Sequence, residues 1–176
     1  VCGRRTLTFA ETVAVATEME KPMTSLESRV QRLEDIEEIR RLKLRYALLC
    51  DNGYDPDALA DLYTEDAQWI PTVNEHYTGR ASIREYWASV SDEYSFAMHY
   101  MTGHSIDILP SGTEATGTWY LIEPATVSGK ATWLSASYTD RYEKVDGVWK
   151  FSYVELHIKF HTLHTSDWVT TPALPA

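Results

Sequence analysis

Two residues that lie far apart in the sequence, Asp51 and His99, have the side chains needed for a general-base pair. Asp51 follows the apolar stretch 47–50, and His99 lies inside the aromatic and methionine-rich segment 96–101, which we expect to be a strand. A carboxylate bound to one imidazole nitrogen fixes the tautomer of the ring and leaves the other nitrogen free as a base. Each residue also has a plainer interpretation, because a carboxylate at a helix end often binds nearby amides and a strand histidine often belongs to the core.

Two tyrosines flank Asp51 in the sequence, Tyr46 on one side and Tyr54 on the other. A phenol can donate a hydrogen bond to a carbonyl or to a departing hydroxyl without carrying a charge. We therefore place Tyr46 with the catalytic pair and Tyr54 among the substrate-binding residues. The alternative is that both are aromatic side chains of an amphipathic core.

The remaining histidines form two patterns. His104 is five residues from His99, an odd offset that puts them on opposite faces of an unbroken strand unless a bulge intervenes. His157, Lys159 and His161 alternate onto one face of the last expected strand, where they could line a pocket or bind a metal. No carboxylate accompanies these histidines at ligand spacing, so we predict neither a metal nor another cofactor.

The expected strands are rich in large aromatic residues, and we predict that some of them surround a cavity. Such rings suit a flat, apolar ligand of the polycyclic, aromatic or terpenoid kind better than a sugar or a nucleotide. The chain has neither a Gly-rich phosphate loop nor a Gly-x-Ser-x-Gly motif, which disfavours nucleotide cofactors and serine hydrolysis. The candidate substrate-binding residues besides Tyr54 are Trp69, Trp119, Tyr120 and Trp133.

Three helices are expected in the first half of the chain. Thr24 and Glu27 have the spacing of a capping box, and apolar residues then recur every three or four positions to about Cys50, with Lys43 among the residues of the solvated face. Asp55-Pro56 predicts a short helix that continues through Tyr63, and another helix follows Gly79. The predicted apolar face of the first helix comprises Val30, Leu33, Ile36, Ile39, Leu42, Tyr46 and Leu49.

Strands dominate the second half. After a short strand at 67–70, the segments 96–109, 114–123, 132–143 and 148–160 are expected to be strands, separated by Gly-containing turns. Helices followed by strands predict an α+β fold in which a curved mixed or antiparallel sheet packs against the helices and encloses a cavity.

The composition limits the domain count and the partners. A chain of 176 residues is expected to form one domain, at 24–165, between a flexible extension at 1–23 and a tail at 166–176. The formal charge of −10 repels nucleic acid and anionic membranes. With Cys2 and Cys50 as its only cysteines, the chain shows no disulfide framework, and a reducing, cytoplasmic location is expected.

Between about residues 26 and 160 the sequence resembles the SnoaL-like branch of the nuclear-transport-factor-2-like (NTF2-like) superfamily, which includes scytalone dehydratase, bile-acid 7α-dehydratase and the lindane dehydrochlorinase. The resemblance rests on Tyr46 followed five residues later by Asp51, and on the segments 62–69, 79–87, 99–103, 138–142 and 146–151. It implies a cone-shaped α+β fold, a catalytic Asp51–His99 dyad and a phenol at Tyr46. It also implies a homo-oligomer, with a trimer favoured and a dimer possible.

One position departs from the resemblance. Val154 stands where the dehydrochlorinase and the bile-acid dehydratase have an arginine on the last strand, so halide elimination is disfavoured, and Lys150, His157 and Lys159 are candidate replacements. We predict a cofactor-independent lyase that eliminates water from a small apolar hydroxy or carbonyl substrate. The alternatives are an isomerase or cyclase on the same scaffold, or a non-catalytic binding protein, because one fold hosts many functions.

Overall fold

The computed structural model describes residues 25–164. Residues 32–164 form one compact unit. Residues 25–31 belong to a separate unit and contain the start of a helix. The predicted extension 1–23, the tail 166–176, and the capping residue Thr24 lie outside the described residues. The domain limits 24–165 therefore stay a prediction.

The long first helix, α2 (Leu26–Asp51), has nearly the predicted length. At its start the amide of Ser28 donates to Oγ of Ser25 at 3.2 Å, an N-terminal cap within the described residues. The predicted buried face was partly wrong, since Leu33 is 67% exposed and Lys43 is fully buried. Lys43 was assigned to the solvated face because a pattern of residue types cannot show that Asp140 supplies a buried counter-charge.

Two shorter helices follow. In α3 (Pro56–Ala60), Oδ1 of Asp55 accepts from the amides of Asp57 and Ala58 at 3.0 Å, as the Asp-Pro pair predicts. The helix ends earlier than expected because Tyr63 already belongs to a strand. Helix α4 (Arg80–Glu93) begins after Gly79, whose φ of +84° favours glycine.

Seven strands in the described part of the chain form one mixed sheet in the order β2-β1-β7-β6-β5-β3, with β4 also paired to β5. Strand β1 runs parallel to β7, and the other pairs are antiparallel. The short strand β2 was not predicted, and β1 is longer than the predicted segment 67–70. The strands are β1 (Tyr63–Thr72), β2 (Glu75–Thr78), β3 (Tyr94–Ala97), β4 (Tyr100–Ile108), β5 (Glu114–Val127), β6 (Lys130–Val145) and β7 (Val148–Leu163).

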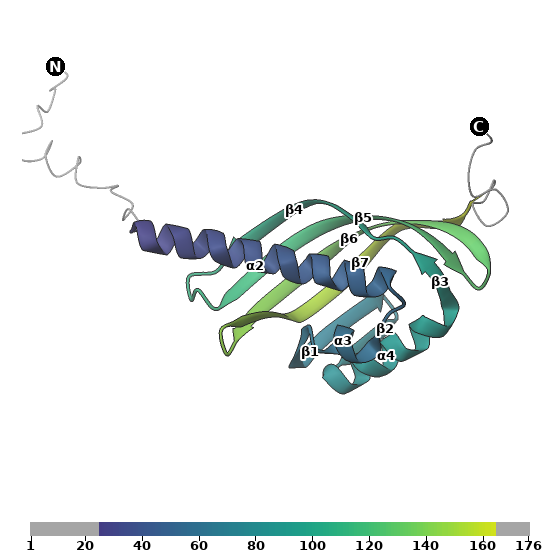
Figure 1. Cartoon of the computed structure of the whole chain (residues 1–176), viewed down its shortest axis with the longest axis horizontal. Helices are drawn as coiled ribbons and strands as arrows, with labels where there is room; N and C mark the ends of the chain where they lie inside the picture. Colours follow the sequence, from purple (N-terminus) through teal and green to yellow (C-terminus); the bar gives the residue numbers. More distant parts are fainter. Residues whose placement is uncertain (1–24, 165–176) are drawn as a thin grey trace, which may run out of the picture. The chain divides into compact units, whose positions relative to one another are not determined.

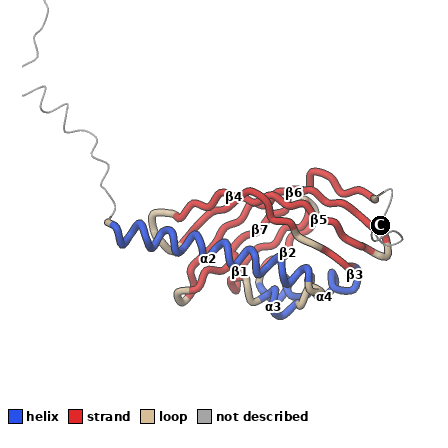
Figure 2. Tube along the Cα trace, turned by 45° about the horizontal axis from the view of Figure 1, so that its top comes forward, coloured by secondary structure: helices blue, strands red, loops and turns tan. Residues whose placement is uncertain are grey.

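The sheet curls, and α2 from Arg32 onward crosses its face, while α3 and α4 lie together near one end (Figure 1). The tube view shows the same arrangement, with β2 close to these two helices (Figure 2). On β5 the residues facing the helices alternate with exposed ones, so that Trp119 and Leu121 enter the core while Tyr120 is exposed. The predicted α+β class, with helices on a strongly curved mixed sheet, is confirmed. Within residues 25–164, no helix combines the length and apolar character needed to cross a membrane.

The predicted strand 96–109 is interrupted. Met98 and His99 belong to neither β3 nor β4, and β4 contains a register shift between Thr102 and His104. The backbone between β3 and β4 is therefore not constrained to alternate its side chains across the sheet. This irregular segment carries the candidate catalytic histidine.

Candidate active site

The structure brings Asp51 and His99 together, as predicted. Oδ1 of Asp51 lies 2.7 Å from Nδ1 of His99 and accepts a second hydrogen bond, at 2.9 Å, from the backbone amide of His99. The His99 side chain is 5% exposed and that of Asp51 is 21% exposed. One carboxylate oxygen thus orients both the backbone and the ring of the histidine, which selects the Nδ1–H tautomer.

The local chain geometry explains how these two residues meet. Asp51 is the last residue of α2, and the chain then turns through Gly53 (φ +97°) and Tyr54 (φ +56°), whose amide donates to the carbonyl of Leu49 at 3.0 Å. His99 lies where β3 gives way to β4, next to Met98, whose amide bonds to Pro124 on β5. The end of a helix therefore meets an interruption between two strands, with Asp51 as the last helical residue and His99 between the strands.

A second carboxylate, Glu123 on β5, was missed. Its Oε2 lies 3.4 Å from Nε2 of His99, and its side chain is 5% exposed. The imidazole therefore lies between two carboxylates, and Nε2, the nitrogen expected to act as the base, has Glu123 within ion-pair distance. Burial raises the pKa of Glu123 above its usual value, His99 opposes that rise, and Asp51 adds to it.

The alternation of β5 could have revealed Glu123. Ala115, Trp119 and Leu121 are buried at every second or fourth position, and Glu123 continues the same face. An acidic residue on the buried face of an alternating strand is costly unless it has a partner or a function. The partner, His99, became visible only in three dimensions.

Two predicted phenols lie beside the histidine. The rings of Tyr46 and Tyr54 each have centroids 6.3 Å from that of His99, in edge-on arrangements. The hydroxyls of Tyr46 and Tyr138 are 3.5 Å apart. Burial raises the pKa of Tyr46, Tyr54 and Tyr138, so all three stay neutral donors near neutral pH.

These groups enclose a small cavity of about 60 Å³. The predicted residues Tyr46, Tyr54, Trp69 and His99 all contribute to its wall. The rest of the wall, which the sequence did not single out for this site, consists of Tyr86, Trp87, Val90, Tyr94, Glu123, Tyr138 and Leu156. The site is therefore predominantly aromatic, with its ionisable groups concentrated at His99.

Trp87 brings a buried donor to the wall of this cavity. Its ring stacks between Tyr54 and Trp69, at centroid distances of 6.0 and 5.3 Å, and the side chain is 2% exposed. Within the described part of the chain, its indole N–H has no hydrogen-bond partner. A buried donor without a partner costs about 1–3 kcal/mol, which an acceptor oxygen on a ligand would offset.

Three predicted substrate-binding residues lie elsewhere. Trp119 faces the core but donates to the hydroxyl of Tyr142 at 2.9 Å, Tyr120 points to the opposite face, and Trp133 donates to His164 at 2.8 Å. None of the three belongs to the wall of the His99 cavity as described for residues 25–164. Aromatic content predicted a lined cavity, but strand parity and position decide which rings reach it.

The expected histidine stripe on the last strand is broken by a bulge. Ser137 pairs with His157, whereas Leu134 pairs with His161, and Lys159 is the extra residue between them. His157 therefore lies on the outer face, bonded to Thr139 at 2.9 Å, and His161 on the inner face. Within residues 25–164, no cluster of three or more potential metal ligands occurs.

His104 also lies outside the cavity. It stacks on Trp119 with a centroid distance of 4.7 Å and accepts a hydrogen bond from Nε of Arg40 at 2.9 Å. A bulge at Gly103, which could have placed His104 on the same face as His99, is present. His104 nevertheless pairs with Trp119 on β5, a residue that does not line the His99 cavity. It has a stacking role.

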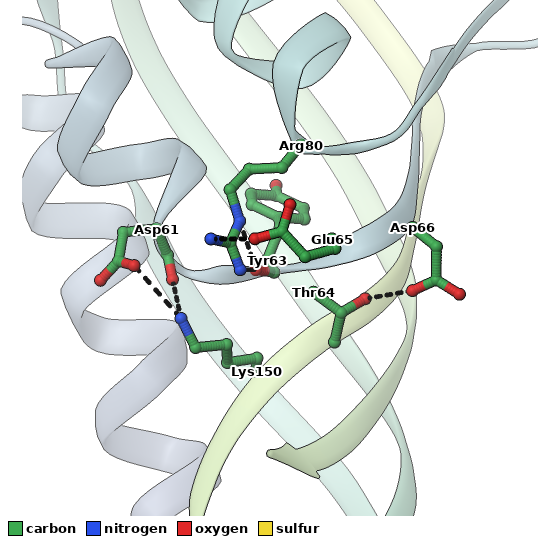
Figure 3. A network of polar contacts seen from close by, with 7 residues as sticks. All are labelled: Asp61, Tyr63, Thr64, Glu65, Asp66, Arg80 and Lys150. Atoms are coloured by element: carbon green, nitrogen blue, oxygen red, sulfur yellow. Dashed lines mark hydrogen bonds and ion pairs between the residues drawn. The ribbon is translucent and has the colours of Figure 1, made fainter. Parts of the chain in front are cut away.

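None of the candidate replacements for the missing arginine reaches the cavity. Val154 is fully buried, and Lys150 is bonded to the backbone oxygen of Asp61 at 2.7 Å and to its carboxylate at 3.2 Å. Figure 3 shows this contact beside a second one, in which Arg80 binds the carbonyl of Tyr63 and the carboxylate of Glu65. Residues 61–65 therefore anchor both the start of α4, through Arg80, and the last strand, through Lys150.

A second buried ionic cluster is sealed inside the core, and we call it the core ion pair. Nζ of Lys43 lies 2.9 Å from Oδ2 of Asp140, and the hydroxyl of Tyr142 donates to the same oxygen at 2.7 Å. Burial lowers the pKa of Lys43 and raises that of Asp140, while their mutual attraction opposes both shifts. The Lys43 ammonium also lies 3.5 Å from the centroid of the Tyr138 ring. Tyr138 is at the same time one of the residues that line the His99 cavity.

Comparison with solved structures shows the same fold. A candidate scytalone dehydratase from Novosphingobium aromaticivorans is 25% identical over 79% of this chain and 93% of its own, with a TM-score of 0.72. A LinA-type3 hexachlorocyclohexane dehydrochlorinase from Novosphingobium barchaimii is 22% identical over 79% and 96%, with a TM-score of 0.71. An NTF2-like protein with a cystatin-like fold from Novosphingobium aromaticivorans is 23% identical over 80% and 92%, with a TM-score of 0.65.

The match to a family extends over most of the chain. Residues 31–155 match the SnoaL-like domain, and this range contains Asp51, His99 and Glu123 together with every strand except the end of β7. The chain therefore belongs to the SnoaL-like domain family and has its NTF2-like fold.

Proposed function

We propose that the chain is a cofactor-independent lyase that eliminates water from an apolar substrate bearing a hydroxyl near a carbonyl or allylic carbon. The observation that carries the proposal is the row of Asp51, His99 and Glu123 along a small aromatic cavity. In an elimination, a base removes a proton from carbon and an acid protonates the leaving group, and a neighbouring base and acid can perform these two transfers.

The proposed step conserves protons. Nε2 of His99 removes a proton from the substrate carbon, the C–H electron pair forms the new double bond, and the C–O bond breaks. The departing hydroxyl takes the proton of the Glu123 carboxyl and leaves as water. The imidazolium then returns its proton to Glu123 across the 3.4 Å separation, which restores the starting state.

The protonation states support this assignment. A carboxyl acts as an acid only if it keeps its proton, and burial raises the pKa of Glu123 in that direction. Asp51, which accepts two hydrogen bonds from His99, instead stabilises the imidazolium that forms.

The neutral donors supply the remaining stabilisation. The Tyr46 phenol, with Tyr54 beside it, assists the departing hydroxyl, and the unpaired indole N–H of Trp87 can bind the substrate carbonyl. This indole donor would serve in place of the arginine that Val154 replaces. Aromatic walls exclude water, which strengthens each of these hydrogen bonds.

The comparisons support an elimination as the reaction class. The similar structures include a candidate scytalone dehydratase and a hexachlorocyclohexane dehydrochlorinase, and both names describe lyases. The proposal nevertheless rests on the site, because a shared fold hosts many chemistries.

Proton abstraction can be tested without knowing the substrate. The protein is incubated in D2O with β-tetralone, a flat ketone with acidic C–H groups, and deuterium uptake is followed by NMR. We expect exchange above the buffer rate, lost in His99→Ala and strongly reduced in Asp51→Asn. Exchange that is no faster with the wild-type protein than with His99→Ala would refute the assigned base.

The elimination itself is tested by mass spectrometry on a panel of aromatic and terpenoid β-hydroxy ketones. A product lighter by one water supports dehydration. A product of unchanged mass with a moved double bond or a new ring indicates the isomerase or cyclase, and binding without conversion of any compound indicates a binding protein.

A further inference from the structure

A second hollow, of about 300 Å³, adjoins the catalytic cavity. Tyr86, Val90, Tyr94 and Leu156 belong to the walls of both, so the two spaces are neighbours separated only by these side chains. The outer hollow lies between α4, the β1–β2 hairpin and the end of β7. Of these elements, α4 and β2 lie close together in both views (Figures 1 and 2). We call this second space the outer subsite.

The volumes of the two spaces determine which part of a substrate each of them can hold. Sites for small organic ligands usually measure about 300–1,000 Å³, far more than the 60 Å³ around His99. The catalytic cavity can therefore hold only the reacting carbons and their oxygen substituents. The outer subsite is large enough for the rest of a ring-containing molecule.

The walls of the outer subsite indicate which molecule fits. Tyr77 and Tyr86 pack with a centroid distance of 4.8 Å, and Leu156 and Ile158 face them from β7. These side chains favour a ring system, while Thr72 and Ser89 in the same wall favour one that carries hydroxyl or amino groups.

The charges of the outer subsite are unbalanced. Glu75 and Glu93 contribute two carboxylates, His161 contributes an imidazole, and within the described residues neither lysine nor arginine lines the space. Glu75 accepts hydrogen bonds from Thr72 at 2.9 Å and from Tyr77 at 3.4 Å, which fixes its position. A carboxylate or phosphate on the ligand would meet like charges here, whereas an amine or a neutral hydroxyl would not.

We infer that the outer subsite binds the non-reacting part of the substrate and selects a ring-containing body without an anionic group. This inference rests on the proposed function for the position of the reacting carbon. It narrows the substrate class to neutral or amine-bearing ring compounds and excludes acids and phosphate esters with the charge at the far end.

Binding of matched probes tests the selection. Three β-tetralones carry a hydroxyl, an aminomethyl or a carboxylate group on the ring remote from the ketone, and calorimetry measures their affinities. We expect the carboxylate probe to bind at least tenfold more weakly than the hydroxyl probe and the aminomethyl probe at least as tightly. In the double variant Glu75→Gln with Glu93→Gln, the gap between carboxylate and hydroxyl should shrink to threefold or less.

Glu85→Gln is the matched control, because Glu85 is an exposed acid on α4 that does not line the outer subsite. It should leave the affinity gap unchanged. Equal affinities of all probes for the wild-type protein, or an equal narrowing in Glu85→Gln, would overturn the inference. Calorimetry needs no turnover, so a failure of deuterium exchange would remove the proposed chemistry and leave this result standing.

Discussion

The core ion pair and the row of Asp51, His99 and Glu123 differ in the balance of their charges and in their surroundings. The core ion pair matches one ammonium, Lys43, with one carboxylate, Asp140, and both side chains are fully buried. Around His99, one imidazole lies between two carboxylates, and all three line or adjoin a cavity. An ammonium and a carboxylate that neutralise each other away from solvent are not expected to transfer protons to a ligand. One imidazole between two carboxylates beside a cavity, in contrast, can share a proton and pass it to a ligand.

Burial of charge alone therefore does not mark a catalytic site. Both clusters are costly to bury, and both carry shifted pKa values. Only the cluster at His99 combines such a shift with an accessible space and neutral donors. We therefore expect substitutions in the core ion pair to affect stability and substitutions at His99 to affect activity.

The largest effect is expected for His99→Ala. Loss of the base should slow proton abstraction by about 10²- to 10⁴-fold, the usual contribution of a general base. The fold should stay intact by circular dichroism. His157→Ala, a histidine on the outer face bonded to Thr139, is the control and should keep full activity.

Lys43→Met should mainly destabilise the fold. Removal of one member leaves Asp140 buried without its counter-charge, which costs about 3–5 kcal/mol. Denaturant unfolding measures the loss, and the double variant Lys43→Met with Asp140→Leu should recover most of it. Loss of deuterium exchange in Lys43→Met at unchanged stability would contradict the contrast between the two clusters.

An exposed ion pair provides the reference for that measurement. Arg84 binds Asp57 at 2.6 Å on the surface, where solvent screens the attraction. Arg84→Met should produce no measurable change in the unfolding midpoint.

Glu123→Gln should change the pH dependence of stability. The folded-state pKa of Glu123 is raised above the ordinary value of 4.5, so the native state holds this proton more tightly than the unfolded state. The wild-type protein should therefore lose stability as the pH rises from about 4.5 through the raised pKa, by about 1.4 kcal/mol for each pH unit that separates the unfolded and folded pKa values. Glutamine does not titrate, so the variant should lack this loss.

Unfolding curves across this pH range measure the effect. Glu85→Gln, an exposed substitution on α4, should retain the wild-type slope. A parallel pH profile for Glu123→Gln and the wild type would show that Glu123 holds no extra proton.

Tyr46→Phe should have the smallest effect. Its hydroxyl contributes one neutral hydrogen bond, worth about 0.5–1.5 kcal/mol, so deuterium exchange or turnover should fall by roughly tenfold or less. Tyr63→Phe is the control, because the Tyr63 hydroxyl is buried without a partner among the described residues and does not line the cavity. Equal effects of both substitutions would remove Tyr46 from the site.

Several features could be predicted because they depend on neighbours in the sequence. The Asp55-Pro56 cap, the helix after Gly79 and the extent of α2 reflect local hydrogen bonding and side-chain spacing. The Asp51–His99 contact was predicted from the chemistry of a carboxylate–imidazole pair and from the family resemblance, and the structure brings the two side chains together. The homo-oligomer and the cytoplasmic location stay predictions.

Other features could not be predicted because they depend on residues distant in the chain. The burial of Lys43 requires Asp140, and the role of Glu123 requires His99. The bulge at Lys159 separates His157 from His161, although strict alternation predicted one shared face. Residue types do not show where a strand gains an extra residue.

The amino-acid sequence predicts most of the helices and strands, and hence the α+β class, because hydrophobic period and capping act over a few residues. It also supplied the groups for proton transfer. His99 has two carboxylate neighbours, and its catalytic space is small and adjoins a larger one, because of long-range packing that no pattern of residue types reveals. Those properties come from side chains on α2, α4, β5 and β7 that meet only when the sheet curls, so their distances are set by packing and not by spacing along the chain.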